Sequence, residues 1–299
     1  MSRRAWLGLA LALLALPVRA HVVFERTSLR EWITRSDLVL VAAFESDARI
    51  WTAPDGSDRQ EYFRVRALET LHGAAPDGAF DFFPHAEGFP AFHAGDRALL
   101  FLERTATRPE FASLAARFPW FSVQGAGHEW RLAGTDGERT LAVARRWLGL
   151  RAQRAADPPA AVRAIVVEEL GSGVARLQTD AIGELVRMHT LPGFLDAEGL
   201  AALRPFVDSP ALSLTQRLAL VRLLEAAPGF DPRPALRSLA GEARAGSGAE
   251  LAQMIQVAGA SDDPALQTWL ASLAGDERPW VQRAVREAQE SAALRSRIP

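Results

Sequence analysis

The sequence predicts an α+β protein of two domains, a small β-barrel followed by an all-α array of helical hairpins. Two observations lead to this prediction. Short β-branched and aromatic segments separated by Gly, Pro and Asp turns occupy residues 21–138. Apolar residues at helical spacing then occupy residues 157–299. We expect a helix within 139–156 to connect the two domains.

The composition is that of an ordinary globular protein. The chain has 299 residues, enough for two hydrophobic cores, and a formal net charge of -2. Without a basic excess there is little electrostatic attraction to nucleic acid or to an anionic membrane, so we expect neither as a partner. The sequence contains no cysteine, which excludes disulfides, thiol catalysis and cysteine metal sites. We expect no cofactor.

Residues 1–20 are predicted to be an export signal. Arg3 and Arg4 precede an apolar stretch from Ala5 to Leu16, and Val18-Arg19-Ala20 has the pattern of a cleavage site. We therefore expect a periplasmic or secreted protein that is not inserted in a membrane after the signal is removed. Ser2 to Leu7 resembles a twin-arginine signal, so the general secretory route and the twin-arginine route both remain open.

The first domain is predicted to hold short strands, with one helical segment before them and another inserted late among them. Ser28 to Ile33 reads as an amphipathic helix, and Phe111 to Phe118 as a second one late in the domain. The expected strands are 37–44, 61–68, 79–83, 98–103, 120–123 and 128–132. Short strands in this arrangement are typical of a small closed or partly closed barrel.

Three segments carry a resemblance to a known family. They are Ser-Asp-Leu-Val-Leu-Val at 36–41, Ala-Gly-Asp-Arg-Ala-Leu-Leu-Phe-Leu at 94–102 and Val-Gln-Gly-Ala-Gly at 123–127. With the leading helix they resemble the OB-like barrel of netrin-like domains over roughly 27–132. The resemblance implies one alternative function, inhibition of an extracellular peptidase whose metal the free amine of His21 would approach. The cysteines characteristic of the eukaryotic family are missing.

The second domain is predicted to be a repeat of helical hairpins. Helix starts recur at Asp157, Asp196, Asp231 and Asp263, each an acid suited to an N-cap. The second helices of the four hairpins are expected at 174–189, 213–226, 247–258 and 279–294. Such a repeat at a period of 30 to 40 residues is the pattern of a solenoid.

One of these second helices is defined most clearly. Leu214, Leu218, Val221 and Leu224 follow helical spacing, and Ser213 with Gln216 forms the pattern of a capping box. The last helix carries Val281-Gln282-Arg283-Ala284 with Ala288, which resembles the second helix of HEAT-like repeats. That resemblance covers about 157–294 and implies an α-solenoid.

These patterns favour a non-catalytic interaction protein. In stacked hairpins, the polar residues of the second helices are expected to form one strip. We predict that this strip holds Arg187, Arg222, Gln253 and Arg286, and that its arginines bind carboxylates of a protein partner or an acidic glycan. The alternative is that these side chains only keep the surface soluble. Aromatic residues between Pro84 and Phe92 offer a second binding rim.

A copper site is the remaining alternative. Signal removal would make His21 the first residue, and its α-amine and imidazole with one more histidine can bind copper. His85, His93 and His128 lie in the same predicted domain. This reading would make the protein a copper-binding or oxidative protein. A zinc hydrolase would be indicated by two histidines four residues apart on a helix, and the sequence has no such pair.

Overall fold

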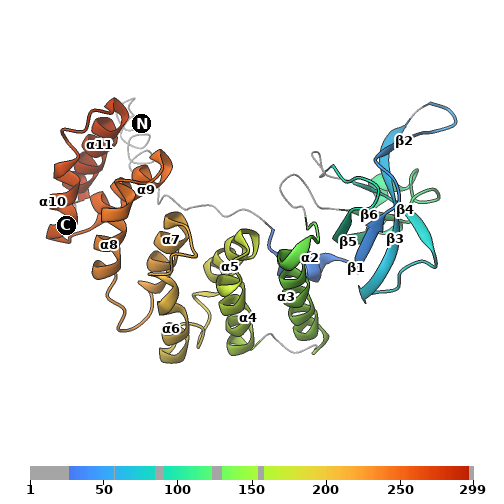
Figure 1. The fold of residues 1–299 in the computed structure, drawn as a ribbon, viewed down its shortest axis with the longest axis horizontal. Coiled ribbons are helices and arrows are strands. Elements are labelled where there is room, and N and C mark those ends of the chain that lie inside the picture. The colour runs from blue at the N-terminus through green and yellow to red at the C-terminus, as the bar shows by residue number, and fades with distance from the viewer. Residues whose placement is uncertain (1–26, 57, 85–90, 123–129, 154–157, 296–299) are drawn as a thin grey trace, which may run out of the picture.

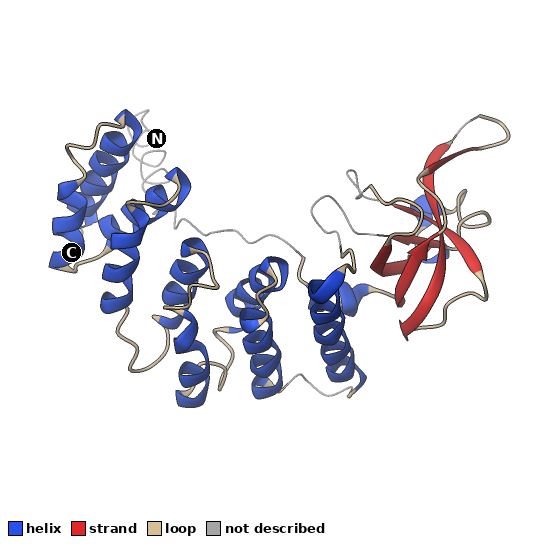
Figure 2. Cartoon of the chain, in the orientation of Figure 1, coloured by secondary structure: helices blue, strands red, loops and turns tan. Residues whose placement is uncertain are grey.

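The chain folds into a strand barrel followed by a curved array of helices, so the predicted α+β two-part fold is confirmed (Figures 1 and 2). The computed structural model describes residues 27–56, 58–84, 91–122, 130–153 and 158–295. The predicted export signal therefore lies outside the described residues. Among the described helices, none has the length and apolar character needed to cross a membrane.

Five of the six described strands close a barrel. The strands are β1 (Leu38–Phe44), β2 (Arg49–Thr52), β3 (Arg59–His72), β4 (Ala79–Pro84), β5 (Arg97–Arg104) and β6 (Trp120–Ser122). Their order is β1-β5-β6-β4-β3, and β3 also pairs with β1, which closes the sheet on itself. The β4–β6 pair is parallel, whereas the other described strand pairs are antiparallel. Strand β2 pairs with the first part of β3 and extends the sheet as a ribbon.

Strand β3 bends to close the barrel. Val41 of β1 is paired with Glu69 of β3, but Ala42 is paired with Ala67, so Leu68 has no partner across the pair. A second shift of the same kind lies between Val39 and Leu40. Each extra residue is a β-bulge, which bends a strand and increases its twist.

The barrel core explains why β1 and the middle of β5, Ala98 to Leu102, are continuously apolar. In β1, Leu38 and Leu40 belong to the cluster inside the barrel, whereas Val39 belongs to the cluster formed mainly by the helices. In β5, Leu100 faces the barrel interior and Phe101 packs with the helices. Both faces of these strands are therefore covered, which removes the alternation expected of a half-exposed strand.

Two features of the barrel differ from the sequence prediction. Strand β2 was not expected. The helix expected from Phe111 to Phe118 is wrong, because the chain forms a 3-10 turn at Pro109–Phe111 followed by further hydrogen-bonded turns. The spacing of apolar residues still has a cause, because Leu114 and Phe118 pack with Phe83 and Phe121 in a separate cluster. Of the strand expected at 128–132, the described part shows one bridge, between Ala98 and Arg131.

Helix α2 precedes the barrel, α3 follows it, and the helices from α4 on form consecutive hairpins. Their bounds are α2 (Leu29–Arg35), α3 (Gly134–Ala152), α4 (Pro159–Gly171), α5 (Ala175–Met188), α6 (Ala197–Leu203), α7 (Leu214–Leu224), α8 (Arg233–Ala243), α9 (Gly248–Ala260), α10 (Pro264–Ser272) and α11 (Pro279–Arg295). The second helices α5, α7, α9 and α11 contact one another in sequence. They lie on the inner side of the curve of the array (Figure 1).

Two of the four predicted acidic N-caps are confirmed, and so is the capping box predicted for α7. Ser213 and Gln216 form the capping box at the start of α7. Asp196 accepts a hydrogen bond from the amide of Gly199, and Asp263 accepts one from Ala265. Asp231 lies one residue before the cap of α8, and Asp157 lies outside the described residues.

One apolar core runs from the barrel wall through the whole array. It contains Val39, Leu99 and Phe101 of the barrel, and it continues through α2 and α3 to Val285 of α11. Because its buried side chains belong to this core, α3 packs against both the barrel side and the helical array and is not only a connecting segment. Its buried side chains include Trp147.

Candidate functional site

The inner helices are joined to one another by neutral hydrogen bonds. The Gln216 side-chain amide of α7 donates to the Thr179 hydroxyl of α5 at 3.3 Å. The Thr215 hydroxyl of α7 donates to the Gln253 side-chain oxygen of α9 at 3.0 Å. These bonds run from α5 across α7 to α9 and make the polar inner face continuous over three hairpins.

The four residues predicted for the binding strip lie on these inner helices but in different environments. Arg222 on α7 is about half exposed and forms an ion pair of 3.1 Å with Glu225. Gln253 is half-buried and is held by Thr215. Arg286 on α11 is exposed.

Arg187, the fourth strip residue, is engaged elsewhere. Its guanidinium donates to Glu184 Oε1 at 2.7 Å and lies 3.4 Å from Glu31 Oε2. Glu31 belongs to α2, the helix that precedes the barrel, and Glu184 is buried on α5. Arg187 therefore connects α5 to α2, and it faces a network that the sequence did not indicate.

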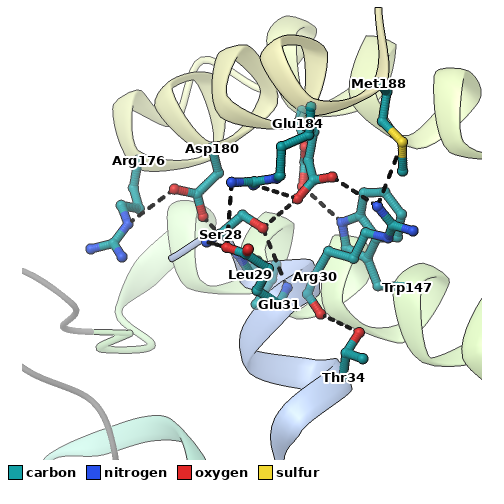
Figure 3. A network of polar contacts seen from close by, with 12 residues as sticks. Ser28, Leu29, Arg30, Glu31, Thr34, Trp147, Arg176, Asp180, Glu184 and Met188 are labelled. Carbon is teal, nitrogen blue, oxygen red and sulfur yellow. Dashed lines mark hydrogen bonds and ion pairs between the residues drawn. The ribbon is translucent and has the colours of Figure 1, made fainter. Parts of the chain in front are cut away.

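That network holds the amino-terminal end of α2 against α5 (Figure 3). The backbone amide of Leu29 donates to Asp180 Oδ2 at 2.9 Å. The Ser28 hydroxyl donates to Glu184 Oε1, and the Arg30 guanidinium donates to Glu184 Oε2 at 3.0 Å. A carboxylate at this end of a helix satisfies unpaired amides and complements the helix dipole.

The carboxyl-terminal end of α2 is also held, by α3. The Arg151 guanidinium donates to the backbone carbonyl of Ile33 and, at 3.2 Å, to that of Ser36. Arg151 of α3 therefore caps α2. A cation at this end of a helix pairs with its last carbonyls.

Two buried carboxyl groups at this junction have raised pKa values. Burial raises the pKa of Asp180 from 3.8 to about 7, although Arg176 and the Leu29 amide oppose the shift. Burial also raises the pKa of Glu169 well above its usual value. Glu169 accepts a hydrogen bond of 2.8 Å from the Trp147 indole, and its other oxygen has no hydrogen bond from the described residues.

The burial of the acids on α5 could have been predicted from their spacing in the sequence, although neither composition nor a known motif indicates it. On α5, Leu177, Asp180, Ala181, Glu184 and Leu185 recur at spacings of three and four residues, so they share one helix face. All of them are buried. Acidic residues on an apolar stripe predict either a paired buried charge or a shifted pKa.

A shallow cleft of about 380 Å³ lies between α3 and α4. Arg139, Glu168 and Ser172 provide its polar lining. Arg139 already donates to the Ser172 carbonyl at 2.7 Å, and Glu168 is paired with Arg146. The cleft thus offers no unpaired nucleophile beside a base, which an acyl- or glycosyl-transfer site would need.

The histidines give no described metal site. His21, His85 and His128 lie outside the described residues, as do residues 85–90 of the proposed aromatic rim. His93 is exposed and lies 3.4 Å from an Asp47 oxygen. Within the part of the chain that the structure describes, no three acidic, histidine or cysteine side chains are grouped to hold a metal ion.

Comparison with known proteins adds no family to this description. No profile of a known protein family matches it, and no curated protein matches it significantly in sequence. The structure itself defines the class as a closed five-stranded barrel joined to a helical array.

Proposed function

We propose that this chain is an exported, non-catalytic interaction protein that binds its partner on the inner face of α5, α7, α9 and α11. The observation that carries this proposal is the continuous stacking of these four helices along the inside of the curve (Figure 1). Stacked hairpins use such extended faces for recognition. The netrin-like and HEAT-like resemblances remain our interpretation of the two halves.

The chemistry of the inner face favours an acidic partner. Arg222 and Arg286 are exposed, and a guanidinium binds a carboxylate with two parallel hydrogen bonds. The Arg222–Glu225 pair is between exposed groups three residues apart, so it costs little to exchange Glu225 for a carboxylate of the partner. The partner class is a protein segment or glycan that carries carboxylates.

The test is reversal of charge on the inner face alone. We expect R222E/R286E to weaken binding of poly-L-glutamate, a carboxylate probe, at least 10-fold, because two cations become anions. The control is R204E, which reverses a single exposed arginine on the first-helix side of the array and so makes half the change in net charge. Binding is measured by fluorescence anisotropy, and folding by circular dichroism.

Arg187 is left out of this variant for a structural reason. A glutamate at 187 would place a further carboxylate beside buried Glu184, so a loss of binding would follow from a disturbed junction. Equal binding by the wild type, R222E/R286E and R204E would contradict an acidic partner on the inner face. Equal weakening by R222E/R286E and R204E would show only a general charge effect.

A further inference from the structure

Helix α2 is the piece of chain that fixes the barrel to the helical array. Leu29, Trp32 and Ile33 of α2 are buried in the core shared with the helices. The barrel strand β1 begins three residues after α2 ends, at Leu38. Helix α2 also contacts α3 and β5. A change in the seating of α2 would therefore change how the barrel is attached.

The contacts of α2 with its neighbours are charged at both ends. Asp180 and Glu184 of α5 hold its first residues (Figure 3). Arg151 of α3 holds its last carbonyls. Asp180 and Glu184 are each almost wholly inaccessible to solvent. Seating of α2 thus encloses carboxyl groups that its release would return to water.

We propose that α2 is an acid-tightened clip, in which proton uptake by Asp180 favours the seated helix and proton loss loosens the attachment of the barrel. This device does not depend on the proposed partner of the inner face. Geometry carries it, because the Asp180 carboxyl is buried and meets the Leu29 amide in the seated arrangement; the amide favours the ionised form, and burial outweighs it.

The charged groups around Asp180 come from three helices. From α5, Arg176 has its guanidinium 3.6 Å from Asp180 Oδ1, and Glu184 and Arg187 are one and two turns farther along. From α4 comes Glu169. The groups contributed by α2 are the Leu29 amide, Arg30 and Glu31.

The sign of the effect follows from burial. Seated, Asp180 has a pKa of about 7, whereas an exposed aspartate has its ordinary value of 3.8. Between these two values, the seated form holds a proton that the released form gives up. Acid therefore favours seating, and this contribution is lost as the pH rises through about 7.

Hydrogen exchange of the α2 amides measures the clip directly. After correction for the chemical exchange rate, the protection of α2 in the full-length protein should fall by about 30-fold from pH 5.5 to pH 8.0, if release returns Asp180 fully to water. The α9 peptide, Gly248–Ala260, serves as the internal reference. Its protection should change much less, because its buried side chains do not titrate.

Two variants assign the effect to Asp180. D180N keeps an oxygen that can accept the Leu29 amide but has no proton to exchange, so its α2 protection should lose most of the pH dependence. D208N, at an exposed aspartate, should behave as the wild type. Equal pH dependence of α2 and α9 in the wild type would overturn the proposal, and so would unchanged α2 dependence in folded D180N. If D180N does not fold, the wild-type comparison of α2 with α9 decides.

Discussion

The junction between barrel and helices gathers three buried carboxyl groups, whereas the seams between later helices are mixed: Glu242 is about half exposed, and Asp263 is buried but bonded to Arg237. At the junction, Asp180, Glu184 and Glu169 are all buried. In the array, buried Arg217 pairs with Glu242, but that glutamate side chain is about half exposed. Both regions use ion pairs, so pairing alone does not distinguish them.

The pKa values show what the difference in burial does. The hydrogen bond from Arg217 lowers the pKa of Glu242, whereas burial raises the pKa of Asp180 despite its arginine neighbour. A carboxylate in contact with water keeps its hydration, and a neighbouring cation stabilises its ionised form further. A carboxylate enclosed in the core loses its hydration, and the nearby cation does not restore all of it. The two regions should therefore respond differently to substitution and to pH.

The largest effect is expected from Glu184→Ala at the junction. The substitution removes the acceptor of Ser28, Arg30 and Arg187 together, leaving charges at a largely buried contact. Breaking a buried ion pair from one side costs about 3 to 5 kcal/mol. We expect a loss of that size in the free energy of unfolding, measured by urea denaturation. Glu242→Ala in the array is the matched control and should cost clearly less, and equal losses would remove the distinction between the two regions.

Much of the array follows from its sequence because the determining signals are local. The capping box at Ser213 and the apolar spacing from Leu214 to Leu224 fix α7 within a few residues. Barrel strands such as β1 were also predicted, since they are apolar and bounded by polar residues. Each of these signals is complete within about a dozen residues.

The parts that the sequence did not predict depend on distant neighbours. Strand β2 has only four residues, and its definition comes from pairing with the long strand β3. The apolar residues of the turns at 109–118 have helical spacing because their side chains pack on Phe83 and Phe121. Asp180 meets α2 across 151 residues of sequence, so no local pattern shows that contact. The prediction from helix faces therefore included Arg187 as a binding residue but missed its contacts with α2.

An intermediate effect is expected where α9 and α11 approach each other closely within the array. At Gly259 of α9, an added Cβ would lie 2.6 Å from the Cβ of Ala288 on α11 and 3.2 Å from its backbone. Gly259→Val should therefore force α9 and α11 apart and lower the free energy of unfolding by about 1 to 3 kcal/mol. Because no charge is involved, the loss should be the same at pH 5.5 and pH 8.0, as measured by urea denaturation. Gly241→Val is the control, since no atom lies near its added Cβ.

The smallest effect is expected in the neutral hydrogen bonds between inner helices. Thr215→Val keeps the shape of the side chain but removes the hydroxyl that donates to Gln253 at 3.0 Å. Both residues are only half-buried, so water can replace part of the lost bond, and we expect a cost of about 0.5 to 1.5 kcal/mol. The double-mutant cycle with Gln253→Ala isolates the coupling between the two side chains. A coupling near zero would mean that the inner helices are held by apolar packing alone. A coupling that varied between pH 5.5 and pH 8.0 would contradict the contrast with the junction, because neither side chain exchanges a proton in this range.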